Sequence, residues 1–301
     1  MSNVLVINMG LKSIRCIIFN QQGTKLGSAS CAINTAINDK CVEQEPNEWW
    51  EKAKIVIRKA LLDARLQRVD FITVTTSASC LVCMDSSGNA IGKALMISDK
   101  RAEKEAETIS QMPEFKKVYY ETGLAMSVSL MLPKILWVKQ NQPGIFERTS
   151  FFLTPNDYLI YQLSGKCITD YFNAIKYHYN VHTQKYPEEL LNKMGIYSKT
   201  FPKVMDSGEK VGAILPEVAE ELGINKDCQI IISSYDAICS FVGSGVVEEG
   251  ESSDVSGTVT VFRTLSKKKN ICCSNKVYNI PFYKENAQIV GGSNNLGGGL
   301  I

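Results

Sequence analysis

The sequence lacks an excess of charge of either sign. Its 301 residues include 33 lysines and arginines against 31 aspartates and glutamates, a formal net charge of +2. So small a net charge produces no strong field that would attract a polyanion or a charged bilayer. We therefore expect neither nucleic acid nor a membrane as a partner. With 45% hydrophobic and 21% charged residues, the composition is that of a globular protein with a sizeable core.

The sequence also lacks segments that would direct it to a membrane. No apolar run approaches the ~20 residues that a spanning helix needs. The N-terminal stretch 1–7 has no basic residue before its apolar run, which turns polar at Asn8. Ten cysteines without a secretion signal are typical of a reducing compartment rather than of a disulfide framework. These features predict a cytoplasmic protein.

Patterns for a dedicated metal or redox site are missing as well. Cys80 and Cys83 have the CxxC spacing, but their segment reads as a strand, in which side chains three apart point to opposite faces. His178 and His182 would meet on a helix face, yet no third ligand lies near them. We expect these four side chains to be structural. The Gly-x4-Gly-Lys-Ser/Thr nucleotide loop is also absent.

Strands and helices alternate after an opening meander. Three apolar runs separated by turns predict antiparallel strands at 4–7, 14–19 and 25–33. Pro46, whose missing N–H costs nothing at a first helical position, begins an amphipathic helix. The other expected elements are strands at 70–75, 81–84, 228–232, 259–264, 276–283 and 288–290, and helices at 101–112, 130–138, 155–163 and 237–242.

This alternation predicts an α/β domain over about residues 1–250. The remaining fifty or so residues are too few to bury a core of their own. They read as the first strands of a second lobe.

Three motifs in succession suggest phosphate chemistry. Segment 8–15 (Asn-Met-Gly-Leu-Lys-Ser-Ile-Arg) places a glycine at a bend, where backbone N–H groups can hold phosphate, although a plain hairpin turn explains it better in isolation. Asp236 opens a helix, whose dipole favours an ionised carboxylate that can accept a hydroxyl proton; a capping aspartate is the alternative. Gly257-Thr258, between two β-branched runs, is either a second phosphate hairpin or an ordinary turn.

Asp99 and Arg101 follow an apolar strand and precede a helix. Such a pair can bind the hydroxyls of a polyol. The alternative is a capping aspartate beside a surface arginine.

Taken in order, these segments resemble the FGGY family of carbohydrate kinases. Segment 8–15 resembles the family's first phosphate motif, Asp-x-Gly-Thr-x-x-x-Arg, and 42–50 resembles its helix start, EQ-(D/E)-P-x-x-W-W. The other matching segments are 97–101 with Trp-x-Asp-x-Arg, 157–165 followed by Thr169-Asp170, 234–237 with the catalytic-base motif, and 255–258 with the second phosphate motif. The resemblance covers essentially the whole chain.

The resemblance implies an actin-like, ribonuclease H-like α/β fold, a mixed sheet with flanking helices in two lobes around a cleft. Residues 1–250 would form the substrate-binding lobe, and 251–301 the start of an incomplete nucleotide-binding lobe. Family members transfer the γ-phosphate of ATP, with Mg²⁺, to a hydroxyl of a sugar or polyol. By resemblance, Asp236 is the general base.

The resemblance also assigns two groups of binding residues. Those implied near the phosphates are Asn8, Gly10, Lys12, Ser13, Arg15, Gly257 and Thr258. Those implied near the acceptor are Ser77, Ala78, Ser79, Asp99, Arg101 and Asp236.

The chain departs from the family pattern in three ways. Asn8 stands where the family has an aspartate on the metal side, so a ligand to Mg²⁺ here would be a neutral amide. Ile97 replaces the usual tryptophan of the sugar site. Relatives continue well beyond this length, so we expect very weak ATP turnover from these residues alone. The alternative function is a non-catalytic sugar-binding or regulatory module. Because an incomplete lobe would expose apolar surface, self-association as a homodimer is also expected.

Overall fold

The computed structural model describes residues 2–256, 260–268, 277–282 and 286–294. A six-stranded mixed sheet lies at its centre, in the order β12-β13-β6-β1-β2-β3. The bounds of these strands are β1 Asn3–Met9, β2 Ser13–Asn20, β3 Lys25–Ala32, β6 Phe71–Thr76, β12 Lys210–Ala213 and β13 Gln229–Ile231. The first three strands are antiparallel, as predicted, and β6 runs parallel to both β1 and β13.

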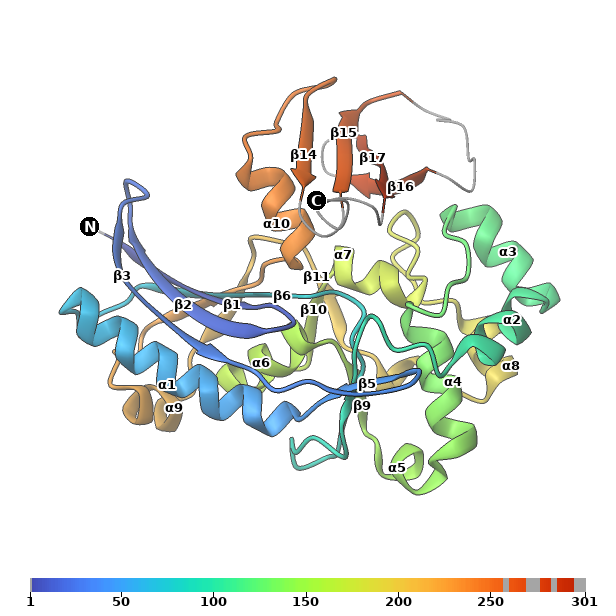
Figure 1. The fold of residues 1–301 in the computed structure, drawn as a ribbon, viewed down its shortest axis with the longest axis horizontal. Helices are drawn as coiled ribbons and strands as arrows, with labels where there is room; N and C mark the ends of the chain where they lie inside the picture. Colours follow the sequence, from blue (N-terminus) through green and yellow to red (C-terminus); the bar gives the residue numbers. More distant parts are fainter. Residues whose placement is uncertain (1, 257–259, 269–276, 283–285, 295–301) are drawn as a thin grey trace.

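Helices cover both faces of this sheet (Figure 1). On one side lie α1 (Pro46–Ala64), α6 (Pro155–Ser164) and α9 (Pro216–Leu222), and on the other lies α10 (Asp236–Gly243). Helix α1 begins at the predicted proline and buries an apolar stripe that includes Trp49, Val56 and Ala60. Its close packing on β3 depends on a residue without a side chain, since a Cβ on Gly27 would lie 2.6 Å from the backbone nitrogen of Ala64.

A helical region lies beside the sheet and has a hydrophobic core of its own. Its helices are α2 (Glu103–Ser110), α3 (Pro113–Thr122), α4 (Met131–Asn141), α5 (Pro143–Arg148), α8 (Glu188–Met194) and the short η2 (Ser198–Thr200). Short strands tie it to the sheet: β4 (Ala36–Asn38), β5 (Cys41–Gln44) and β8 (Ala94–Leu95) form one sheet, and β7 (Val82–Met84) pairs with β9 (Phe151–Leu153). Near α10, β10 (Ile168–Asp170) pairs with β11 (Lys203–Met205) and leads into α7 (Tyr171–Ala174) and η1 (Ile175–Tyr177).

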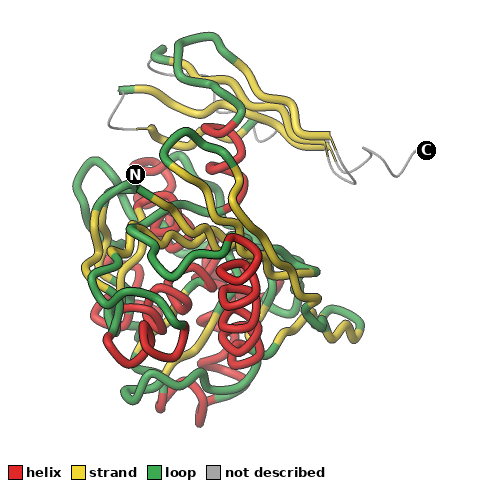
Figure 2. Tube along the Cα trace, turned by 90° about the vertical axis from the view of Figure 1, so that its left-hand side faces the viewer, coloured by secondary structure: helices red, strands yellow, loops and turns green. Residues whose placement is uncertain are grey.

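The C-terminal strands form a separate antiparallel sheet in the order β14-β15-β17-β16. Their bounds are β14 Ser252–Ser256, β15 Thr260–Ser266, β16 Tyr278–Phe282 and β17 Ala287–Asn294. Figure 2 shows this sheet at one end of the molecule, next to α10. The two parts share a hydrophobic cluster in which Leu265 and Ile289 pack with Tyr235 and Phe241.

The structure corrects one local prediction. His178 and His182 do not lie on a helix: η1 ends at Tyr177, and His182 belongs to the turn that follows. No helix among the described residues is both long and apolar enough to cross a bilayer.

Candidate functional site

The hairpin between β1 and β2 is held by backbone and side-chain bonds. The amide of Gly10 donates to the carbonyl oxygen of Ser13 at 3.0 Å. The side-chain amide of Gln44, itself 2% exposed, donates to the carbonyl oxygen of Leu11 at 2.9 Å, and the indole of Trp49 donates to Gln44 Oε1 at 2.8 Å. The bend is therefore anchored to the start of α1.

The predicted phosphate residues of this hairpin differ in exposure. Lys12 and Arg15 are exposed, whereas Asn8, Gly10 and Ser13 are half-buried. The bend at Gly10 therefore carries two exposed cations beside three half-buried residues.

Asn8 lies on the sheet face that α10 covers. It pairs with Arg15 of β2 on one side and with Thr75 of β6 on the other. The hydroxyl of Thr75 donates to Cys239 Sγ of α10 at 3.4 Å, and residues paired in register point to the same face. The amide of Asn8 therefore faces the helix that Asp236 opens.

Asp236 meets the carboxyl ends of β1 and β6. The amide of Ser77, just beyond β6, donates to the carbonyl oxygen of Met9 at 3.1 Å. The hydroxyl of Ser77 donates to Asp236 Oδ2 at 3.4 Å. The structure thus brings together three regions that the sequence analysis singled out separately: the first hairpin, segment 77–79 and the start of α10.

Burial and the helix start act on Asp236 in opposite directions. The helix dipole favours the ionised carboxylate, as the sequence led us to expect, whereas burial raises the pKa of Asp236 above its usual value. The amide of Ala237, the hydroxyl of Ser77 and the charge of Arg263 partly oppose that rise. A raised pKa makes a carboxylate a stronger proton acceptor.

The sequence did not reveal that the charge of Arg263 acts on the Asp236 carboxyl. This arginine lies on β15, is 8% exposed, and its Nε has no hydrogen-bond partner within the described ranges. Its strand packs against the elements around α10 through Leu265. Arginine is usually exposed, and the strand pattern around Arg263 does not indicate that this one is buried.

Segment 77–79 leaves β6 in an unusual conformation. Ala78 and Ser79 are 7% and 3% exposed, and Ser79 has φ 58°, in the left-handed region that non-glycine residues rarely adopt. The fully buried Lys134 of α4 donates to the Ser79 carbonyl oxygen. The sequence predicts an apolar helix over 130–138, in which Lys134 is the one charged residue. That exception was the only sequence signal of a buried lysine here.

Asp99 and Arg101 form a buried ion pair, not a cap beside a surface arginine. Arg101 Nε and Nη2 donate to both carboxylate oxygens of Asp99 at 2.8–3.0 Å, and the amide of Val42 adds a bond of 2.7 Å. Arg101 Nη2 also donates to Glu43 at 2.7 Å, and its guanidinium stacks 4.8 Å from the centre of the Trp137 ring. The pair is rigidly held at the end of segment 97–101.

Two sets of predicted residues remain. Gly257 and Thr258 lie outside the described residues. Cys80 and Cys83 are buried free thiols, and burial raises their pKa to about 11 and about 12, as expected of structural cysteines.

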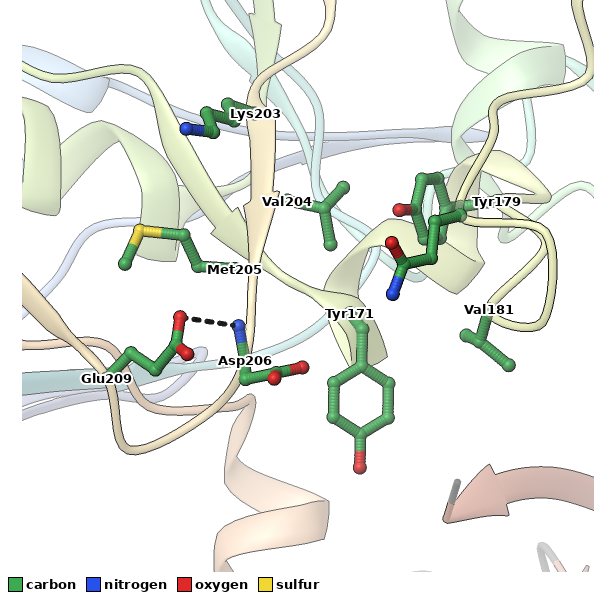
Figure 3. A pocket seen from close by; sticks show the side chains of 9 residues that line it. Tyr171, Tyr179, Val181, Lys203, Val204, Met205, Asp206 and Glu209 are labelled. Carbon is green, nitrogen blue, oxygen red and sulfur yellow. Dashed lines mark hydrogen bonds between the residues drawn. The ribbon is translucent and has the colours of Figure 1, made fainter. Parts of the chain in front are cut away.

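A separate cavity of about 260 Å³ is lined by Tyr171, Tyr179, Lys203, Asp206 and Glu209, among others (Figure 3). Within it, the amide of Asp206 donates to Glu209 Oε2 at 3.3 Å. None of the predicted site residues lines this cavity.

The groups near Asp236 offer few ligands to a magnesium ion. Among the described residues no group of three or more His, Cys, Asp or Glu side chains is placed to hold a metal. Asp236 supplies one carboxylate, and Asn8 supplies an amide oxygen on the same side of the sheet. Mg²⁺ commonly binds through one or two carboxylates plus substrate phosphates. The residues present fit a metal that arrives with a nucleotide, not a resident ion.

Solved structures share this architecture. Gluconate kinase from Lactobacillus acidophilus superimposes with a TM-score of 0.90 over 99% of this chain and 60% of its own, at 21% identity. Glycerol kinase from Plasmodium falciparum with ADP gives a TM-score of 0.87 over 97% and 61%, at 18% identity. The predicted actin-like α/β fold is confirmed.

Proteins of similar sequence are also kinases. Xylulose kinase from Bacillus subtilis (strain 168) is 24% identical over 92% of this chain and 56% of its own length, and autoinducer-2 kinase from Klebsiella pneumoniae is 26% identical over 86% and 50%. The chain spans about half the length of these relatives. The profile described as "FGGY family of carbohydrate kinases, N-terminal domain" matches residues 3–243. The chain therefore belongs to the FGGY family of carbohydrate kinases.

Proposed function

We propose that this chain carries the acceptor-binding half of an enzyme that phosphorylates a hydroxyl of a sugar or polyol with ATP. The observation that carries the proposal is the meeting of Asp236 with Ser77 at the ends of β1 and β6. A half-buried carboxylate beside a phosphate-type hairpin suits the removal of a hydroxyl proton as the phosphoryl group is transferred.

Each residue has a role in this proposal. Asp236 accepts the proton of the attacking hydroxyl at its carboxylate. Ser77, Ala78, Ser79, Asp99 and Arg101 bind or orient the acceptor. Asn8, Gly10, Lys12, Ser13 and Arg15, together with Gly257 and Thr258, contact the phosphates.

ATP and Mg²⁺ are the proposed cosubstrate and cofactor. Mg²⁺ supplies charge neutralisation of the phosphates when bound. Asn8 would be the oxygen donor to the ion on the sheet side of the site. Because its amide carries no charge, we expect weak affinity for the free ion and tighter retention with a nucleotide.

The proposal extends to organisation and setting. We propose a lobe boundary near residue 250, which is supported by the gap between α10, ending at Gly243, and β14, starting at Ser252. A cytoplasmic location and assembly as a homodimer belong to the same proposal. The relatives named xylulose, glycerol and gluconate kinases suggest a polyhydroxylated acceptor.

A coupled ADP-release assay with MgATP and a panel of xylulose, glycerol, gluconate and related polyols tests the chemistry. We expect sugar-dependent release well below the ~1–100 s⁻¹ of complete kinases, and its loss in Asp236→Asn. Sugar binding without any sugar-dependent ADP release would instead support the non-catalytic binding module. The same result should then be found when the C-terminal half of a relative is added to the assay.

A further inference from the structure

The ammonium group of Lys134 joins three loops from inside the protein. Lys134 lies on α4 and is 0% exposed. Its Nζ donates to the carbonyl oxygen of Ser79 at 2.5 Å and to that of Met96 at 2.8 Å, and the carbonyl oxygen of Ser129 lies 3.5 Å away. Backbone atoms far apart in the sequence thus share one charged donor.

Burying an ammonium group is costly, because the charge loses its water. The titratable groups that act on Lys134 are Cys80, Asp99 and Arg101, and desolvation outweighs them, lowering the pKa of Lys134 to about 8. Asp99 is already bonded to Arg101 and does not bond Lys134. The ammonium group of Lys134 instead donates its hydrogen bonds to backbone carbonyl oxygens. Its effect is therefore on the position of those two backbone segments.

The carbonyl that makes the shortest of these contacts belongs to a strained residue. Ser79 has φ 58°, a conformation that persists in a non-glycine residue only when its surroundings impose it. Lys134 supplies such a constraint directly. On the next turn of the same helix, Trp137 stacks on Arg101, which holds Asp99. Helix α4 therefore contacts both predicted acceptor segments, 77–79 through Lys134 and 97–101 through Trp137.

From this geometry we infer that Lys134 is a positioning residue for the acceptor. It fixes the backbone of 77–79 relative to Met96 and the segment that follows, and so sets the spacing between the two proposed acceptor segments. The inference rests on the proposed function, because it names what holds that function's acceptor site in shape.

The chain contains a matched control on the same helix. Lys139 Nζ donates to the carbonyl oxygens of Met194 and Gly195 at 2.7 and 3.0 Å, so it is also a lysine that ties α4 to a loop through two carbonyls. None of its partners belongs to the predicted site. Lys134→Met and Lys139→Met remove the same group from two ends of one helix.

The experiment measures sugar affinity by calorimetry and amide hydrogen exchange by mass spectrometry, both well below the unfolding temperature. For Lys134→Met we expect affinity to fall about tenfold or more, the loss typical of removing a charged group's hydrogen bonds, and exchange to accelerate in 77–80 and 96–99. For Lys139→Met we expect affinity within about twofold of wild type and faster exchange around 194–195. If Lys134→Met does not fold, Lys134→Gln provides the same comparison.

Two results overturn the inference: unchanged sugar affinity in the folded Lys134 variant, or equal losses in both variants, which would show that affinity merely follows stability. A wild-type chain that binds no sugar of the panel overturns the proposed function and this inference with it. The wild-type titration is done first, so a failure of the proposed function is recognised before any variant is compared.

Discussion

The hydroxyl of Ser77 donates to the carboxylate of Asp236 across 3.4 Å, although the two residues are 159 positions apart in the chain. The contact arises because β6 runs parallel to β1 and to β13, so the ends of these strands lie together where α10 begins. In open α/β sheets, this end of the strands is where ligands bind. The relationship places the proposed base at the position where sugar and phosphate would meet.

The first prediction concerns the pKa of Asp236. Ser77→Ala and Arg263→Met each remove an influence that lowers this pKa, so both variants should raise it further. An NMR titration of the Asp236 side-chain carboxyl, assigned by its loss in Asp236→Asn, measures the shift. Arg263→Lys keeps the charge and should change the pKa less. An Asp236 pKa that stays the same in Arg263→Met would contradict the proximity of the two groups.

The second prediction concerns pH and stability. Asp157 is completely buried at the start of α6, and burial raises its pKa from 3.8 to about 7. Between these two values the folded state holds a proton that the unfolded state has released. The free energy of unfolding should therefore fall as pH rises from about 4 to 7.

Asp157→Asn tests this directly. Asparagine keeps an oxygen that can accept from the amide of Thr154, as Asp157 Oδ2 does at 2.9 Å, but carries no charge. Urea unfolding should show a variant about 1 to 4 kcal/mol more stable than wild type at pH 8, with little difference near pH 4. Equal pH slopes for the two proteins would refute the raised pKa.

The third prediction concerns the packing of α1 on the sheet. In Gly27→Ala the new methyl would lie 2.6–2.7 Å from backbone atoms of Ala64 and Ala60, which cannot rotate away. We expect a loss of about 1 to 3 kcal/mol in unfolding free energy. Gly144→Ala in α5, where nothing lies within 4 Å of the added Cβ, is the control and should be neutral or slightly stabilising. Similar effects of both changes would argue against this close approach.

The fourth prediction concerns the contribution of the Asp99–Arg101 ion pair to stability. Arg101→Met would leave the buried Asp99 carboxylate without its cation, at a cost of about 3 to 5 kcal/mol. The double variant with Asp99→Asn removes both charges and should recover part of that loss. Denaturant titrations of the four proteins give the coupling energy. If the losses of unfolding free energy in the two single variants simply add up in the double variant, Asp99 and Arg101 do not stabilise each other.

Sequence reasoning succeeded where one periodic pattern determines one element. The apolar stripe of α1, which includes Trp49 and Ala53, and the apolar runs of the first three strands predicted these elements. The alternation of strands and helices further along the chain predicted the α/β class, and the family resemblance implied the actin-like fold. Short strands such as β4 and β5 were missed because three or four residues carry no measurable period. Their existence depends on partners elsewhere in the chain.

The site was only partly predictable for a similar reason. Asp236 could be identified from its place after an apolar strand, but its raised pKa depends on burial that no local pattern records. Arg263 and Lys134 act through residues 27 and 55 positions away, so only the folded chain shows what they contact.

Direct calorimetric titration of this chain with xylulose, glycerol and gluconate tests the central claim most directly. The account predicts saturable binding of at least one of them, with a Kd of about 1 mM or tighter. This affinity should be nearly retained in Asp236→Asn and should fall about tenfold or more in Lys134→Met. No binding of any polyol by a folded chain would contradict it.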